Sequence, residues 1–115
     1  MDKKLLMIGA GGHGKVVAEV AAACGYDNVK FLDDNSPEAI GKIKDMASFI
    51  KEFPNAFVGI GNNQFRNEMI TRLIETGYPI PVLIHPTAYG SKSASISKGT
   101  IVEPMAVINA NTVVE

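Results

Sequence analysis

Short runs of apolar residues alternate with segments of helical periodicity from residue 4 to about residue 84. The strand-like runs are 5–8, 29–32, 56–60 and 79–84, each short enough for a buried parallel strand. Two longer segments repeat apolar residues at helical spacing, and they contain Val16, Val17, Val20, Ala21 and Cys24, and Phe65, Met69, Ile70, Leu73 and Ile74. Gly25 and Gly77 follow them as helix stops, and a short helix is expected over 46–53. This alternation predicts an α/β fold, a Rossmann-like parallel sheet with flanking helices.

The pattern changes after His85 and Pro86 to a period of six. The apolar positions are Ile96, Val102, Ile108 and Val114, and the small residues two places before them are Ala94, Thr100, Ala106 and Thr112. A hexapeptide period is typical of a parallel β-helix, in which each six-residue step forms one side of a coil. The sequence therefore predicts two domains, residues 1–85 and residues 86–115. Because a solenoid coil needs neighbours to bury its face, and the repeat is cut at Glu115, a piece of a longer protein is expected.

Composition narrows the class of protein. Hydrophobic residues make up 46% of the 115 residues and charged residues 20%, as in a folded domain. The net charge of −1 gives no basic surface for nucleic acid or a membrane. The single cysteine, Cys24, permits no internal disulfide and is expected to be a small buried side chain. Without a membrane-length apolar run or a signal-peptide pattern, a cytoplasmic protein is expected.

A glycine-rich turn follows the first predicted strand and opens the first predicted helix. Gly9, Gly11 and Gly14 have the G-x-G-x-x-G spacing of dinucleotide sites, and Gly12 lies between them. Such a turn lets the backbone approach a phosphate closely, and the free N–H groups at the helix start then face the anion. The turn therefore predicts a phosphate-binding site, although a purely structural turn is the simpler alternative.

His13 and Lys15 lie in the same turn. A cation at the start of a helix opposes the helix dipole, at a cost of about 0.3–1 kcal/mol, so Lys15 is easier to explain if it meets an anion. A solvated surface lysine explains it equally well. His13 is expected to be a neutral donor to phosphate or sugar, and the alternative is a histidine that caps the turn.

Polar residues follow the second and third strands as well. They are Asp33 and Asp34 after the second strand, and Gly61, Asn62, Asn63 and Arg66 after the third. The carboxyl ends of parallel strands share one edge, and open α/β sheets bind ligands there. Asp33 is placed to accept from a ribose hydroxyl or a base N–H, but it also suits a turn, and Asn62 suits a helix cap. No metal site is predicted.

The ordered set of motifs resembles one family, the sugar O-/N-acetyltransferases of the left-handed β-helix class. This family includes the sialic acid O-acetyltransferases and the UDP-4-amino-sugar N-acetyltransferases of the bacillosamine pathway. The matching motifs are GAGGHGKVV at 9–17, FLDD at 31–34, IGNN at 60–63 with Arg66, and LIHP at 83–86, followed by hexapeptides.

The resemblance implies that residues 1–85 hold a nucleotide sugar, with a UDP-amino-sugar expected. It places Gly9, Gly11, Gly12, His13, Gly14 and Lys15 near the phosphates and sugar, and Asp33 and Asp34 at the uracil end. Gly61, Asn62, Asn63 and Arg66 complete the pocket. It also implies that residues 86–115 are the first coil of a left-handed β-helix that binds acetyl-CoA in a homotrimer, without a metal.

In such enzymes a histidine acts as general base while a sugar amine or hydroxyl attacks the thioester. The resemblance places that histidine beyond Glu115, so no catalytic residue and no activity are expected here, and His85 is expected to be structural. Two other readings stay open: an NAD-dependent oxidoreductase domain and a non-catalytic nucleotide-sensing module. The sequence does not distinguish N- from O-acetylation and does not identify the sugar.

Overall fold

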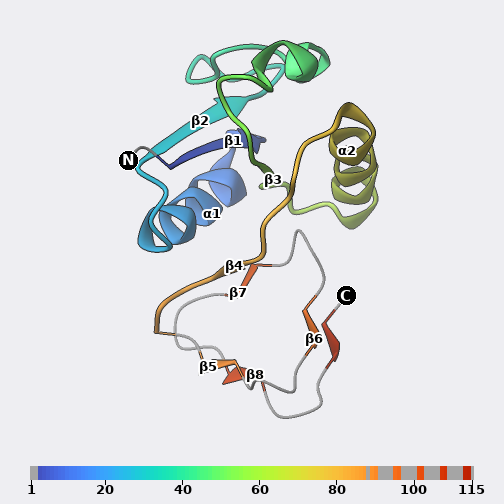
Figure 1. The fold of residues 1–115 in the computed structure, drawn as a ribbon. Helices are drawn as coiled ribbons and strands as arrows, with labels where there is room; N and C mark the ends of the chain where they lie inside the picture. Colours follow the sequence, from blue (N-terminus) through green and yellow to red (C-terminus); the bar gives the residue numbers. More distant parts are fainter. Residues whose placement is uncertain are drawn as a thin grey trace.

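The computed structural model describes residues 3–87 and the two-residue strands at 89–90, 95–96, 101–102, 107–108 and 113–114 (Figure 1). Up to residue 76 the elements are β1 (Lys4–Ile8), α1 (Gly12–Ala23), β2 (Asn28–Leu32), the 3-10 helix η1 (Ile43–Phe49), β3 (Ala56–Val58) and α2 (Asn63–Thr76). The remaining strands are β4 (Leu83–Ile84), β5 (Tyr89–Gly90), β6 (Ser95–Ile96), β7 (Ile101–Val102), β8 (Val107–Ile108) and β9 (Val113–Val114).

A parallel sheet in the order β2-β1-β3 forms the centre of the first part. Met7 of β1 pairs with Phe31 of β2 on one side and with Phe57 of β3 on the other. The middle strand is buried on both faces, because α1 packs against β1 and β2 while α2 packs beside β3 (Figure 1). The predicted parallel sheet with flanking helices is confirmed.

The two helices end where the sequence predicts. Gly25 and Gly77 have φ values of 101° and 102°, a left-handed conformation that glycine adopts without strain. Helix α1 turns Val17, Val20 and Ala21 inward. Val16 was expected on this apolar side but is 48% exposed, because one residue rotates a helix by about 100° and Val17 occupies the inward position.

The short helix lies earlier than the predicted 46–53. Its first N–H, that of Ile43, donates to Oδ1 of Asp34 at 3.0 Å, and the N–H of Lys42 donates to Oδ2 of Asp45 at 3.4 Å. These bonds start η1 at Ile43, and the helix ends at Phe49. On the inner side the Tyr78 hydroxyl donates to the Met46 carbonyl at 2.6 Å, and burial raises the pKa of Tyr78 to about 12.

The run at 79–84 does not add a strand to the main sheet. Only Leu83–Ile84 forms a strand, β4, and it pairs with β7. The pairs β4-β7, β5-β8 and β6-β9 are all parallel and offset by 18 residues, which is three hexapeptides. Most residues between these strands lie outside the described part of the chain, so the β-helix and the domain boundary at 85 stay predictions.

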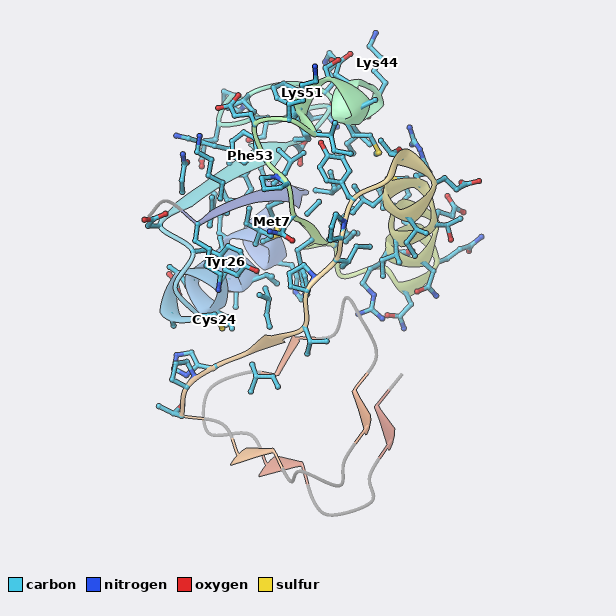
Figure 2. The ribbon with its side chains drawn as sticks, in the orientation of Figure 1. Met7, Cys24, Tyr26, Lys44, Lys51 and Phe53 are labelled. Atoms are coloured by element: carbon cyan, nitrogen blue, oxygen red, sulfur yellow. The ribbon has the colours of Figure 1, made fainter. Side chains whose placement is uncertain are left out.

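Cys24 joins the end of α1 to β4. Its Sγ lies 3.1 Å from the Ile84 carbonyl oxygen, and Figure 2 shows it at the end of α1 that faces β4. The side chain is only partly buried. It is therefore not the enclosed apolar group that the sequence predicts, since it also acts as a thiol donor between two elements.

Candidate functional site

The turns after β1, β2 and β3 meet at the carboxyl edge of the sheet, because all three strands are parallel. Helix α1 begins from the first of these turns and α2 from the third. The strand order reverses here, since β2 and β3 lie on opposite sides of β1. Open α/β sheets bind their ligands at such a point.

Close backbone packing requires three of the glycines. Gly9 has φ of 102°, and a Cβ on it would lie 2.9 Å from the Gly59 carbonyl oxygen. A Cβ on Gly14 would collide with the Gly9 carbonyl oxygen, and one on Gly59 would lie 2.8 Å from the Gly14 Cα. Because they lack a Cβ, these glycines allow the loop after β1, the first helical turn of α1 and the loop after β3 to pack closely against one another. Gly59 is not among the predicted site residues, although a glycine at the end of a strand signals close backbone approach.

Gly11 and Gly12 have a different environment. Both are exposed, and a Cβ on either would meet nothing within 4 Å. Neither has a positive φ. In the described structure no side chain caps α1, and its first turn contains no acidic residue. Within the described residues, the N–H groups at the start of α1 therefore have no side-chain acceptor, and an anion is a suitable partner for them.

Asp33 connects two of the turns. Its Oδ2 accepts from the Ala10 N–H at 2.9 Å, and its Oδ1 accepts from the N–H groups of Asn35 and Ser36 at 2.8 and 3.1 Å. These bonds, that of Ala10 above all, lower the pKa of Asp33. The bonds to Asn35 and Ser36 are the turn role named above as the alternative for Asp33, and the bond to Ala10 adds that Asp33 also fixes the glycine turn.

Asp34 is exposed and also holds backbone. Besides its bond to Ile43, its carbonyl oxygen accepts from Nζ of Lys42 at 3.0 Å. Both aspartates therefore shape the loop after β2 in this structure, and a ligand contact for either stays a prediction.

Lys15 forms an ion pair, but its partner is a carboxylate of the protein itself. Its Nζ lies 2.8 Å from Oε1 of Glu38, in the loop after β2, and the two side chains are 52% and 53% exposed. Sequence reasoning missed Glu38, because a carboxylate in a turn has no periodic signal. His13, two residues earlier, is exposed at the same edge.

The third turn contributes a helix cap and an arginine whose Nε is buried. Oδ1 of Asn62 accepts from the Phe65 N–H at 2.8 Å, so Asn62 caps α2. Gly61 and Asn63 are exposed beside it. One turn into the helix, Nε of Arg66 is buried and has no hydrogen-bond partner among the described residues. A buried donor without a partner costs about 1–3 kcal/mol, and among the predicted site residues in the described structure only Arg66 has such a buried, unsatisfied side-chain atom.

His85 lies apart from these turns. Its Nδ1 accepts from the Thr87 N–H at 3.1 Å and lies 2.9 Å from the Thr87 hydroxyl. The local bonds fit the structural role expected of it. Over residues 3–87 and the short strands, no group of three His, Cys, Asp or Glu side chains is placed to hold a metal ion. None of the helices in the described part of the chain is long and apolar enough to cross a membrane.

Comparison with known proteins gives consistent matches. The family described as the PglD N-terminal domain matches residues 4–73. The UDP-N-acetylbacillosamine N-acetyltransferase of Bacillus subtilis (strain 168) is 31% identical over an alignment of 110 residues, and the match covers 87% of this chain and 51% of that protein. This chain thus spans about half the length of that curated relative.

Two solved structures share the fold. The acetyltransferase domain of PglB from Neisseria gonorrhoeae FA1090, in complex with acetyl coenzyme A, matches with a TM-score of 0.89 and 42% identity, over 99% of this chain and 59% of that one. PerB from Caulobacter crescentus, in complex with CoA and GDP-perosamine, matches with a TM-score of 0.85 and 28% identity, over 96% and 56%. The matches confirm the resemblance seen in the motifs, and the chain belongs to the PglD N-terminal domain family.

Proposed function

We propose that this chain forms the nucleotide-sugar-binding part of an acetyl-CoA-dependent sugar N-acetyltransferase. The Bacillus subtilis relative is named for acetylation of a UDP-linked sugar, and the PerB structure contains CoA and a GDP-linked sugar. These relatives favour an amine over a hydroxyl as the acceptor. They give no support to an NAD-dependent oxidoreductase.

The observation that carries the proposal is the difference between the glycines of the first turn. Gly9 and Gly14 are required by packing, whereas Gly11 and Gly12 are exposed, have free space at the Cβ position and precede or open an uncapped helix. A diphosphate bound there explains both glycines, because it brings its oxygens close to the backbone N–H groups. His13 and Lys15 then lie beside the phosphates and the sugar.

The other two turns supply the rest of the proposed pocket. The loop begun by Asp33 and Asp34 is expected to face the base, with Asp33 holding that loop in place through Ala10. Gly61 and Asn63 are exposed on the other side of β1. Arg66 has an unsatisfied buried donor at this edge, and a polar ligand group is a fitting partner for it.

Acetyl-CoA, the proposed co-substrate, would supply the acetyl group as a thioester. It is expected on the β-helix, outside the turns described above, and the homotrimer and the cytoplasmic location are likewise proposals. Neither His13 nor His85 corresponds to the expected general base, so no step of acetyl transfer is assigned to residues of this chain. The proposed role of residues 1–85 is to bind and orient the sugar nucleotide.

Calorimetric titration of the chain tests this proposal. UDP, a UDP-4-amino-sugar, GDP and NAD are each added to the same preparation. We expect saturable binding of UDP and tighter binding of the UDP-amino-sugar, because the sugar adds contacts beyond the diphosphate. Tight NAD binding without a response to UDP would overturn the proposal in favour of the oxidoreductase.

A further inference from the structure

Glu38 is held in place by backbone contacts of its loop. The hydroxyl of Ser36 accepts from the Glu38 N–H at 3.2 Å, and the Ser36 carbonyl accepts from the Ala39 N–H at 3.3 Å. Ser36 is in turn bonded to Asp33, which is bonded to Ala10 of the glycine turn. This chain of bonds connects the Glu38 backbone to the turn at the start of α1, whatever its side chain contacts.

The Glu38 side chain forms the one ion pair found within the described residues, with Lys15. Lys15 lies in the first turn of α1, where the helix dipole disfavours a cation and no acidic neighbour compensates. Glu38 therefore supplies the negative charge that this end of the helix favours. Its carboxylate does so from another loop, 23 residues along the chain.

The ion pair between Lys15 and Glu38 is easily broken. Both side chains are about half exposed, and exposed ion pairs are weak because water and salt screen them. A phosphate bound at Gly11 and Gly12 offers Lys15 a stronger partner, with more charge and more acceptor oxygens. The Glu38 carboxylate and such a phosphate are both negative and repel each other at one ammonium group, so they compete for Lys15.

From this geometry we infer that Glu38 is an internal competitor for the phosphate group of the ligand, holding Lys15 in the free protein and releasing it when a nucleoside diphosphate binds. The inference rests on the proposed function, because it needs a phosphate at the glycine turn. It adds a residue outside the predicted site that lowers phosphate affinity. Glu38 acts through Lys15 and is a positioning residue.

A double-variant cycle measured with UDP tests the inference. In Glu38→Gln the side chain keeps its size and loses its charge, so UDP should bind roughly two- to fivefold more tightly, the range set by an exposed ion pair. Lys15→Met should weaken UDP binding. In the Lys15→Met background, Glu38→Gln should give no further change in UDP affinity, because the Glu38 carboxylate no longer has an ammonium group to pair with.

Glu75→Gln is the matched control, since Glu75 is an exposed carboxylate near the end of α2 and its loss changes the net charge equally. It should leave UDP binding unchanged. Urea unfolding of each variant verifies that Glu38→Gln is folded, and Glu38→Asp, with a carboxylate one methylene shorter, repeats the test at constant charge and should also tighten binding.

The outcomes separate this inference from the proposed function. Unchanged UDP affinity in Glu38→Gln and Glu38→Asp, or an equal gain when Lys15 is Met, overturns the competitor role alone. Failure of every variant and of the wild-type chain to bind UDP or a UDP-amino-sugar overturns the proposed function, and the competitor role with it.

Discussion

The carboxylate of Asp33 accepts a hydrogen bond from the backbone N–H of Ala10, 23 residues earlier, at 2.9 Å. Ala10 lies between the glycine that leaves β1 and the glycine that precedes α1. The bond therefore fixes the glycine turn from the neighbouring loop, while the other oxygen of the same carboxylate holds Asn35 and Ser36. Two of the three turns at the candidate site share a single carboxylate.

Replacement of Asp33 by Ala should destabilise the fold by about 2–3 kcal/mol, because hydrogen bonds to charged groups are among the stronger ones and three N–H groups lose their acceptor. Urea unfolding at neutral pH measures the loss. Glu75→Gln, which removes an exposed carboxylate on α2, should change the unfolding free energy by less than about 0.5 kcal/mol.

The same carboxylate should make stability dependent on pH in the acid range. The pKa of Asp33 is lowered in the folded state, chiefly by the Ala10 bond. Its contribution is fully present above the unfolded-state pKa of about 3.9 and is lost as the pH falls through the lower folded-state pKa. Asp33→Asn should flatten the curve of unfolding free energy against pH below about pH 4. An unchanged slope in the variant would show that other carboxylates cause the acid loss.

The two classes of glycine predict opposite effects of adding one methyl group to the first turn of α1. Gly14→Ala places a Cβ against the Gly9 carbonyl oxygen and should destabilise by about 3 kcal/mol or more, because backbone on both sides prevents relief. Gly12→Ala has free space and should be neutral or stabilising by up to about 1 kcal/mol. Thermal and urea unfolding of the two variants gives the comparison, and equal losses would contradict the packing argument.

The elements that the sequence predicts well are those with local signals. The strand-like run at 5–8, the helix stop at Gly77 and the cap at Asn62 depend on residues within a few positions of one another. The start of η1 and the pairing of β4 were not predictable in this way. They depend on the bond from Ile43 to Asp34 and on pairing 18 residues away, and neither has a periodic pattern.

At the candidate site, too, the features with a local sequence signal were predictable and those that depend on distant residues were not. Spacing identified Gly9, Gly11 and Gly14 together, but it did not separate the glycines that packing requires from the exposed one. That distinction depends on Gly59, which arrives from another strand. The partner of Lys15 was equally invisible, since a carboxylate in an irregular loop is brought to α1 only by the fold.

Arg66→Met should leave stability unchanged or raise it by about 1 kcal/mol, because the substitution removes a buried donor that has no partner in the described structure. Binding of UDP should weaken if the guanidinium meets the ligand, so unfolding and calorimetry on one variant should move in different directions. A large loss of stability would show instead that Arg66 is a packing residue.

Gly11→Asp should separate helix stability from phosphate binding. Gly11 is the N-cap of α1, with φ of −78° and ψ of −169°, an extended conformation that aspartate adopts readily. Its carboxylate would accept from the N–H groups of the first turn, and its negative charge would interact favourably with the helix dipole. The free energy of unfolding should therefore rise by about 0.3–1 kcal/mol. The same carboxylate takes the position proposed for the diphosphate, and like charges repel, so UDP affinity should fall by about tenfold or more. Asn67→Asp, which adds one charge on the exposed side of α2, should leave both quantities nearly unchanged. UDP binding that survives Gly11→Asp would mean that the ligand phosphate lies elsewhere than at the start of α1.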